Sequence, residues 1–508
     1  MRKLYLLLVS LCLSLSKIDS AKIVALVPFP CKSHAILGSA LLRELARRGH
    51  EVTMISSFPT KDNMKNYRDI YVDPTAALDA HTETIIKAPR FPLLKAVAAL
   101  ECTTRVSDAF LSDPSVKQFL ADGERFDLVV SLGKESLLGV GHALNASTIR
   151  FNMLGMHSIY AAFTMNPLPS AYVPHFLLPY SDDMSFFQRT LNTIMNLFFD
   201  VYIKYVWIHT ENAVVQKHFP GAPHLTELQR DVDVTFVNSH MAMENVRPHM
   251  PNVIQIGGFH LKEKEILPKD IKTFLDNATQ GVILFSMGSS IRAEVLQDKL
   301  NEALKCFATL PYQILWKHDE DVPGQPDNVK TIKWLPQKAV LSHPNLKLFI
   351  THAGLGSVLE SLYYAVPMIA LPIYLDQHKN AAQSVRNGVA IQLDVQTLTA
   401  DRLLWAIREM TANPAYANEI AVRSAAFRHQ EVDPMQRAVY WVEQVIKHKN
   451  ANYLKCIAKD MPMFQYYLLD VFGFIFLFIA VFIAAFSVIA KKLWRCSRGI
   501  IKRKVKQT

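Results

Sequence analysis

Cysteine is scarce in this sequence, with six residues in a chain of 508. No CxxC pair and no Cys/His spacing of a zinc site occurs, so a zinc-binding domain and a disulfide-rich scaffold are excluded. Cys12 and Cys496 lie in the terminal segments. One disulfide remains open among the other four cysteines, and the sequence does not pair them: Cys31, Cys102, Cys306 and Cys456.

The central part of the chain also lacks an excess of charge. The formal net charge is +10, but the tail after Ala490 supplies eight of these charges and the first twenty residues supply a net two. The long segment between them is therefore neutral. This balance excludes a surface built for the phosphate backbone, and we expect no nucleic-acid partner.

Two apolar runs near the chain ends predict membrane targeting. Arg2 and Lys3 precede the run Leu4–Leu15, which predicts a signal peptide over residues 1–20, with a short core helix as the alternative. Residues 464–490 are predicted to form a transmembrane helix, because Val471–Ala490 is uncharged and long enough to cross a bilayer. The basic tail, residues 491–508, then faces the cytoplasm and the rest of the chain the lumen.

Short motifs refine this prediction. Lys504 and Lys506 resemble a dilysine retrieval signal, which predicts residence in the endoplasmic reticulum membrane; a merely basic tail is the alternative. Asn145 and Asn277 begin sequons that are predicted glycosylation sites if they are luminal.

The length favours two domains. The predicted strands Lys22–Val27 and Glu51–Ser56 flank a helix over Ile36–Arg48, and the same alternation recurs from Gly281 to Ala370. This pattern predicts an α/β fold with parallel sheets covered on both faces. Residues 251–268 interrupt it, so we place an N-terminal domain at 21–250 and a C-terminal domain at 251–463.

An aromatic stretch, Phe186 to Phe219, lies between the two βα blocks. Its helical spacing favours packing in the core. An apolar acceptor pocket or a membrane-facing surface remains the alternative.

The segment from Trp334 to Asn380 carries the chemistry. A predicted strand ends at His352, and small residues lead from it into a helix whose first N–H groups can bind a diphosphate. Glu360 follows Ser357 by one helical turn, where a carboxylate can accept both hydroxyls of a ribose. The segment therefore provides base, phosphate, ribose and hexose contacts in order, which we assign to Trp334, His352, Glu360, and Asp376 with Gln377.

This segment resembles the signature of the UDP-glycosyltransferase superfamily, family 1, which implies a GT-B fold of two Rossmann-like domains facing a cleft. Phe29–His34 and Asn166–Pro174 are most similar to invertebrate membrane-bound UDP-glucosyltransferases. The resemblance implies that UDP-glucose or another UDP-sugar is a substrate, with glucuronate as the rival sugar. It also implies small lipophilic acceptors, a role in detoxification, and a homo-oligomer as an open option. The implied UDP-sugar contacts are Ser289, Lys317, Trp334, Gln337, His352, Gly354, Gly356, Ser357, Glu360, Asp376 and Gln377.

His34 matches the family's general base. An imidazole with an ordinary pKa of about 6.5 can take the proton of an acceptor hydroxyl at neutral pH. Attack opposite the departing UDP would invert the sugar linkage. No metal and no other cofactor is expected, because a helix N-terminus and His352 can stabilise the diphosphate. Asp231 and Asp233 resemble the acidic motif of metal-dependent transferases but lie away from the nucleotide segment.

Several positions depart from the family pattern. Leu132 stands where the family places an Asp that orients the histidine, and Glu135 is the candidate substitute. Cys31 and Ala353 replace common glycines, and Gly356 replaces a common polar residue. These departures keep a second hypothesis open, a catalytically weak or inactive protein that binds lipophiles in the lumen. A secreted glycosidase with paired carboxylates does not account for the nucleotide segment.

Overall fold

The computed structural model describes residues 20–60, 63–86, 92–244, 246–262, 265–288, 299–318, 322–449 and 451–505. The chain divides into two compact units, Met1–Lys455 and Cys456–Thr508, which are described separately. The predicted signal peptide lies outside the described residues, apart from Ser20.

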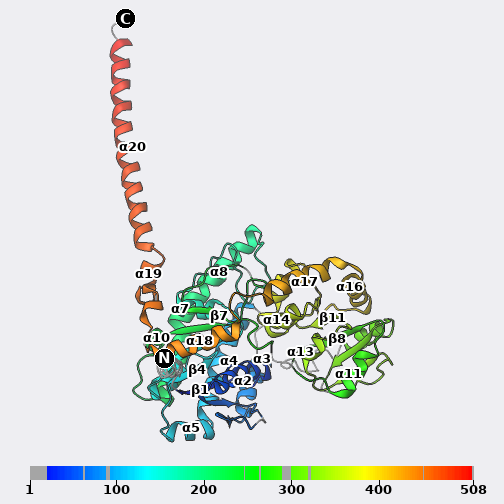
Figure 1. Ribbon diagram of the computed structural model, residues 1–508. Helices are drawn as coiled ribbons and strands as arrows, with labels where there is room; N and C mark the ends of the chain where they lie inside the picture. Colours follow the sequence, from blue (N-terminus) through cyan, green and yellow to red (C-terminus); the bar gives the residue numbers. More distant parts are fainter. Residues whose placement is uncertain are drawn as a thin grey trace, which may run out of the picture. The chain divides into compact units, whose positions relative to one another are not determined.

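The first unit contains a seven-stranded sheet in which every paired strand is parallel (Figure 1). Its central strands are continuous runs of β-branched and other apolar residues buried on both faces, as expected when helices cover both sides of a parallel sheet. The strand order is β3-β2-β1-β4-β5-β6-β7. The strands are β1 (Lys22–Val27), β2 (Glu51–Ser56), β3 (Tyr67–Tyr71), β4 (Leu128–Leu132), β5 (Ser147–Asn152), β6 (Val234–Val237) and β7 (Val253–Gln255).

Helices of this first lobe follow most of its strands. They are α2 (Lys32–Arg47), α3 (Thr75–Ile86), α4 (Pro92–Ser112), α5 (Pro114–Ala121), α6 (Leu138–Ala143), α7 (Ser158–Thr164), α8 (Phe186–Tyr202), the π-helix η1 (Ile203–Trp207), α9 (Ile208–His218) and α10 (Leu225–Asp231). Helix α2 begins four residues earlier than predicted, so His34 lies in its first turn and not in a loop.

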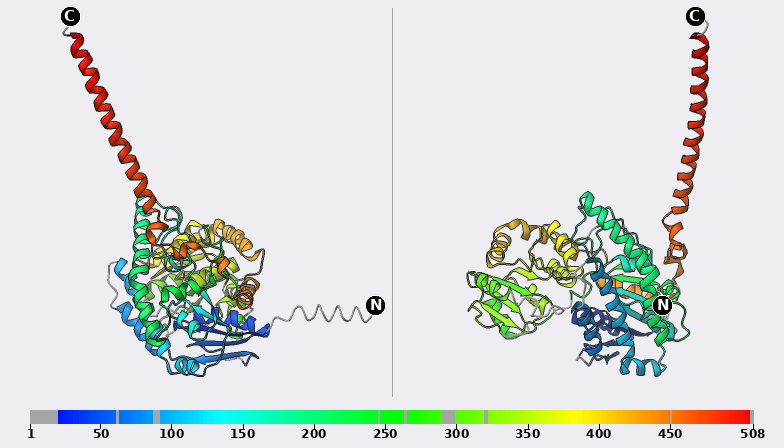
Figure 2. Two further views of the ribbon diagram at one scale, coloured as in Figure 1. Left: turned by 90° about the vertical axis from the view of Figure 1, so that its left-hand side faces the viewer. Right: turned by 180° about the vertical axis from the view of Figure 1, so that it is seen from behind.

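A second, six-stranded parallel sheet follows in the order β10-β9-β8-β11-β12-β13. Figures 1 and 2 show the two sheets as separate lobes, the first coloured blue to green and the second green to yellow. The strands are β8 (Val282–Ser286), β9 (Gln313–Lys317), β10 (Val329–Ile332), β11 (Leu346–Thr351), β12 (Met368–Ala370) and β13 (Ala390–Gln392). The helices are α11 (Lys269–Asp276), α12 (Leu300–Phe307), α13 (Gln337–Leu341), α14 (Leu355–Tyr364), α15 (Gln377–Arg386), α16 (Ala400–Ala412) and α17 (Pro414–Arg428).

The boundary between the lobes differs from the predicted one at residue 251. Strand β7 pairs with β6, and Ile254, Ile256 and Phe259 belong to the core of the first lobe. The last helix, α18 (Pro434–Lys447), returns to that same core through an apolar face that includes Val439 and Val442, and is the orange helix within the first lobe in Figure 1. The chain therefore crosses between the lobes twice, which a linear division of the sequence does not express.

The aromatic stretch has two different faces. Met195, Phe199 and Trp207 are buried in one cluster, which agrees with core packing. On the other face of α8, Phe187 is 81% and Ile194 58% exposed. Core packing is therefore confirmed for one face of α8, while the other face carries exposed apolar side chains.

Asp233, directly before β6, binds the C-terminal end of the first unit. Asp233 accepts from the backbone N–H of Ala451 at 2.9 Å and lies 3.3 Å from the Lys455 ammonium. It therefore anchors the segment after α18. Among the described residues, Cys31, Cys306, Cys456 and Cys496 are free thiols. Asn145 and Asn277 are both exposed.

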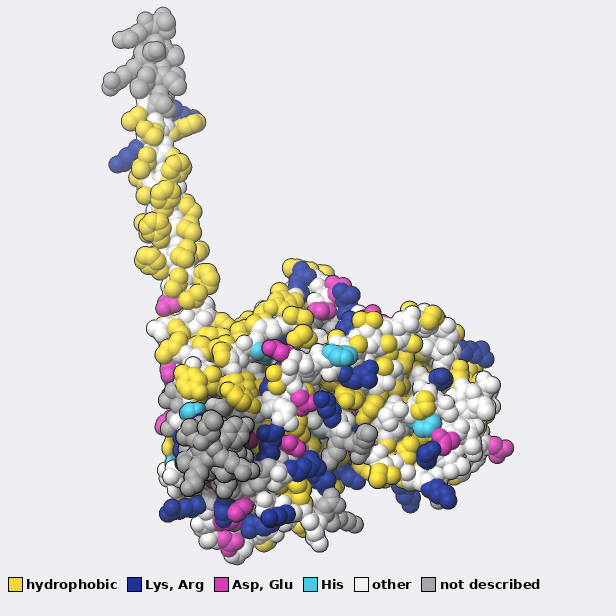
Figure 3. Space-filling model, in the orientation of Figure 1, with side chains coloured by type: hydrophobic (Ala, Val, Ile, Leu, Met, Phe, Trp, Pro, Cys, Tyr) yellow, Lys and Arg dark blue, Asp and Glu magenta, His cyan; other side chains and the backbone are white. Residues whose placement is uncertain are grey.

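The second unit contains the turns η4 (Ile457–Asp460) and α19 (Met463–Tyr466), followed by the helix α20 (Leu469–Val505). Leu469–Cys496 is long and apolar enough to cross a membrane, with a mean hydropathy of 2.8 in its most apolar window. Hydrophobic side chains cover its visible face in Figure 3. The helix begins five residues later than the predicted segment 464–490.

Candidate functional site

The second sheet reverses its strand order between β8 and β11, which pair with Thr351 opposite Ser286. In open α/β sheets, ligands bind at such a switch point, beyond the carboxyl ends of the strands. Gly288 follows β8 and His352 follows β11 directly. The structure thus places Gly288 and His352, one of the predicted phosphate contacts, together at the position that the fold favours.

Two glycines enclose the His352 side chain. A Cβ atom at Gly354 would lie 2.4 Å from Nε2 of His352, and one at Gly288 would lie 2.5 Å from Cε1. Neither position can therefore carry a side chain while the imidazole stays in place. Burial, and then the charge of Lys317, lower the pKa of His352 to about 4. The ring is therefore neutral at pH 7 and can act as an N–H donor.

The N-terminus of α14 follows the imidazole. Gly354 is its N-cap and makes no side-chain cap hydrogen bond, and the N–H of Leu355 in its first turn donates to the Asp376 carboxylate. The N-terminus of α14 therefore binds one anionic group of the protein itself and is a favourable place for another anion. Ala353 adopts a left-handed φ of 61°, which an alanine adopts at a cost of about 1–2 kcal/mol. The Asn380 side-chain amide donates to the Ala353 carbonyl at 3.1 Å and holds this turn.

The predicted ribose contacts are joined to one another. The Gln337 amide, at the start of α13, donates to the Ser357 hydroxyl at 3.3 Å and to a carboxylate oxygen of Glu360. Burial raises the pKa of Glu360 to about 7, against the opposing hydrogen bond from Gln337. Three residues from two helices therefore form one polar group, with a carboxylate half exposed at its edge.

The predicted hexose contacts begin α15. Asp376 is buried, and burial raises its pKa; Asn380 donates to one of its carboxylate oxygens at 2.7 Å. Gln377 accepts from the backbone N–H groups of Ile373 at 2.8 Å and Tyr374 at 3.1 Å. Its oxygen thus stabilises the loop that precedes α15. Asn380 is a site residue that the sequence analysis missed, although its i, i+4 spacing from Asp376 was a readable signal.

The other residues predicted to contact the UDP-sugar differ in their exposure and in their neighbours. Trp334 is 46% exposed, and the Lys32 ammonium from the first lobe lies 3.2 Å from its ring centroid. Lys317 approaches the same ring at 6.0 Å. A Cβ at Gly356 would meet no atom within 4 Å, so the surrounding structure has room for a side chain at this position. Ser289 lies outside the described residues.

The first sheet has its own switch point, between β1 and β4, where Leu26 pairs with Ser131. His34 stands beyond β1, with its ring centroid 5.6 Å from that of Phe29. Its Nδ1 atom is buried and has no hydrogen-bond partner among the described residues. Burial, and then the charge of Lys134, lower the pKa of His34 to about 4.

Glu135, the candidate substitute for the missing carboxylate, binds elsewhere. Its two oxygens accept from the Arg150 guanidinium, both at 2.8 Å, and one also accepts from Gln229 at 2.9 Å. Leu132, at the end of β4, is buried. In this structure neither residue therefore orients the His34 imidazole through a hydrogen bond.

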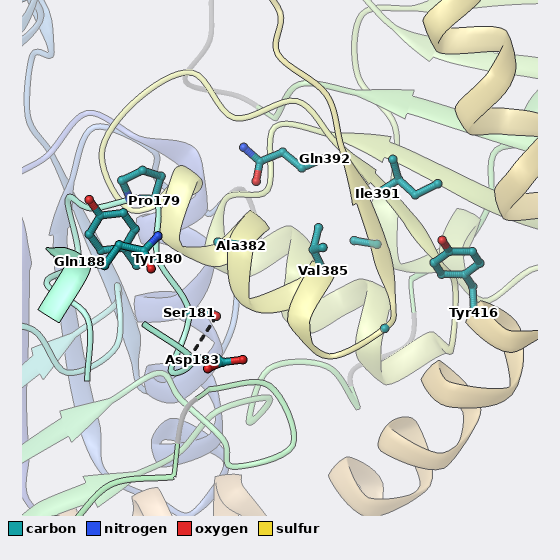
Figure 4. Close-up of a pocket in the computed structure, with 12 residues that line it drawn as sticks. Pro179, Tyr180, Ser181, Asp183, Gln188, Ala382, Val385, Ile391, Gln392 and Tyr416 are labelled. Atoms are coloured by element: carbon teal, nitrogen blue, oxygen red, sulfur yellow. Dashed lines mark hydrogen bonds between the residues drawn. The ribbon is translucent and has the colours of Figure 1, made fainter. Parts of the chain in front are cut away.

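A separate open pocket of about 570 Å³ lies between Pro179–Asp183 and the α15–β13 region, with Tyr416 at one side (Figure 4). It is lined by none of the predicted donor or acceptor contacts. The candidate functional site therefore lies at the carboxyl ends of the strands, and this pocket is not part of it.

Comparison with known proteins gives a consistent result. Residues 24–507 match the family described as UDP-glucoronosyl and UDP-glucosyl transferase. UDP-glucosyltransferase 2 of Dactylopius coccus is 34% identical, over 98% of each chain. UDP-glucuronosyltransferase 2B17 of Rattus norvegicus is 31% identical, over 87% of this chain and 88% of its own.

Solved structures support the fold. A structure described as the glycotransferase of kitacinnamycin aligns with a TM-score of 0.54 and 19% identity, covering 84% of this chain and 99% of that one. At this identity the likeness shows the two-lobed GT-B architecture alone.

Proposed function

The chain belongs to the UDP-glycosyltransferase family, and from that premise we propose that it transfers a hexose from a UDP-sugar to a hydroxyl of a small lipophilic acceptor, inverting the anomeric linkage. The single observation that carries this proposal is the enclosure of His352 by Gly288 and Gly354 at the start of α14. It fits a diphosphate, which needs close approach to backbone N–H groups.

Glucose is the favoured sugar, and glucuronate is the alternative. One relative that matches this chain over 98% of its length is named a glucosyltransferase, whereas the rat relative is named a glucuronosyltransferase. Asp376 and the Gln377 amide are the groups proposed to hold the hexose hydroxyls.

His34 is the proposed general base. Its low pKa keeps the imidazole neutral at pH 7, so it can take the acceptor proton as the oxygen attacks the anomeric carbon. The bond from that carbon to UDP breaks as the new bond forms, and the electron pair leaves with the diphosphate. The α14 N-terminus and His352 stabilise this charge, so the proposal needs no metal ion.

The proposed location is the endoplasmic reticulum membrane, with both lobes in the lumen. The apolar helix α20 and the basic tail after it support this orientation. Exposed Asn145 and Asn277 are available for luminal glycosylation.

The test uses the full-length chain in microsomes, with UDP-glucose and UDP-glucuronate offered against a panel of phenols and alcohols. We expect a β-linked glycoside with one donor. His34→Ala should lower transfer by about 10²–10⁴-fold, because the base is lost. UDP affinity, measured by calorimetry, should stay nearly unchanged, and a variant with wild-type turnover would reject His34 as the base.

A second candidate, a lipophile-binding protein without turnover, is favoured by one observation: among the described residues, the buried Nδ1 of His34 has no hydrogen-bond partner. It would be supported if wild-type protein bound UDP but transferred sugar to no acceptor in the panel.

A further inference from the structure

A lysine stands beside His34 at the switch point of the first sheet. Lys134 lies two residues after the end of β4. His34 lies in the first turn of α2, beyond the carboxyl end of the neighbouring strand β1. Its ammonium lies 5.4 Å from the centroid of the Phe29 ring, whose centroid is 5.6 Å from that of His34. Both nitrogen-bearing side chains therefore contact the same aromatic ring, where the fold places a ligand.

This ammonium has no direct counter-ion. Within the described part of the chain, no carboxylate lies within 4.0 Å of Nζ. The adjacent carboxylate, Glu135, is occupied by Arg150. The nearest acidic group that affects Lys134 is Glu211, which is fully buried and accepts from the Thr104 hydroxyl at 2.5 Å and the Ser136 N–H at 3.0 Å.

A half-buried cation without a close partner is unfavourable, because desolvation is not offset by an ion pair. Burial lowers the pKa of Lys134 to about 8, against the opposing attraction of Glu211. The group is therefore still largely protonated at neutral pH, and a bound anion would restore the missing partner.

We propose that Lys134 binds an anionic group of the acceptor, a carboxylate on a hydroxyaryl compound, and so presents the acceptor hydroxyl to His34. This inference rests on the proposed function and names its acceptor class. Phe29 provides an apolar face for the aryl ring, and the cation–π contact holds the ammonium beside it.

The arrangement also suits the chemistry of the step. Leu132 supplies no carboxylate to stabilise a protonated His34. The ion pair with Lys134 contributes by orienting the acceptor, so that its hydroxyl lies at the neutral imidazole. The acceptor proton passes to His34 as the oxygen–carbon bond forms, and the bond to UDP breaks with its electron pair on UDP. The carboxylate held by Lys134 stays unchanged throughout.

The experiment compares 4-hydroxybenzoate with its neutral analogue 4-hydroxybenzamide, using full-length protein and the preferred UDP-sugar. The readouts are the ratio of kcat/KM for the two acceptors and the Kd of each at equilibrium in the presence of UDP. The variants are Lys134→Gln, the charge-retaining Lys134→Arg, and Lys117→Gln, an exposed lysine on α5 as the matched control.

We expect Lys134→Gln to lower the acid-to-amide ratio at least tenfold and to weaken 4-hydroxybenzoate binding at least tenfold. Lys134→Arg should restore most of both, and Lys117→Gln should change neither. A ratio and a Kd that Lys134→Gln leaves within twofold of wild type would overturn the proposal. Transfer to the amide would then still support the proposed function, whereas the absence of transfer to any acceptor would reject that function independently of the binding result.

Discussion

The two switch points of this molecule have the same topology but are completed differently. On the donor side, polar residues bind one another before any ligand arrives: Gln337 joins Ser357 to Glu360, and Asn380 joins Asp376 to the turn at Ala353. On the proposed acceptor side, His34 and Lys134 share an aromatic neighbour, and neither has a close partner of opposite charge among the residues that the structure describes. In the proposed function, the donor side receives the same UDP group in every reaction and can be preassembled, whereas the acceptor side leaves charges for the ligand to satisfy.

The largest effect should come from breaking the donor side. Gly354→Val would place side-chain atoms in the space of the His352 imidazole, so we expect UDP affinity to fall about 100-fold or more. In Gly356→Ala, two residues later, the added methyl group enters open space. Its loss of UDP affinity should be at least tenfold smaller than that of Gly354→Val. Calorimetric titration with UDP measures both. Equal losses at the two glycines would show that the enclosure of His352 does not determine binding.

A smaller effect is expected when a carboxylate is placed near the His34 imidazole. Leu132 packs against the position of Gly38, one turn after His34 on the same face of α2. In Leu132→Asp, a carboxylate beside the imidazole would raise the pKa of His34 by favouring its charged form.

The pH–rate profile measures this change. The base works only when neutral, so wild-type kcat/KM should fall only as pH drops through about 4, the pKa of His34. In Leu132→Asp this acidic limb should move up by about one pH unit or more. A neutral isostere, Leu132→Asn, should leave the limb in place. An unmoved limb in the Asp variant would show that this position does not reach the histidine.

The smallest effect should be on stability. Ala353→Gly removes the strain of a left-handed alanine in the donor-side turn and should stabilise the chain by about 1 kcal/mol. Ala406→Gly, inside α16, should destabilise it by about the same amount, because glycine disfavours a helix. Denaturant unfolding of the two variants checks the opposite signs. Destabilisation by both changes would mean that Ala353 is not strained.

The sequence by itself determined the α/β alternation, the apolar C-terminal helix and most of the donor segment, because these depend on local periodicity and on residues close together in the chain. It placed His352 directly after a strand and Glu360 one turn after Ser357 on the following helix, as the structure has them. It did not reveal Asn380 as the partner of Asp376, although the spacing was readable.

Only the tertiary structure decided which groups meet across strands that are far apart in sequence. It joined Glu135 to Arg150, left His34 beside Lys134, and returned α18 to the first lobe. Glu135 lies only three residues after Leu132 in the sequence, but strand β5, next to β4 in the sheet, brings Arg150 to its carboxylate. The order of the strands therefore determines which cation Glu135 binds. Strand pairing and helix packing are long-range contacts, so the chemistry of the acceptor side was settled by folding and not by local pattern.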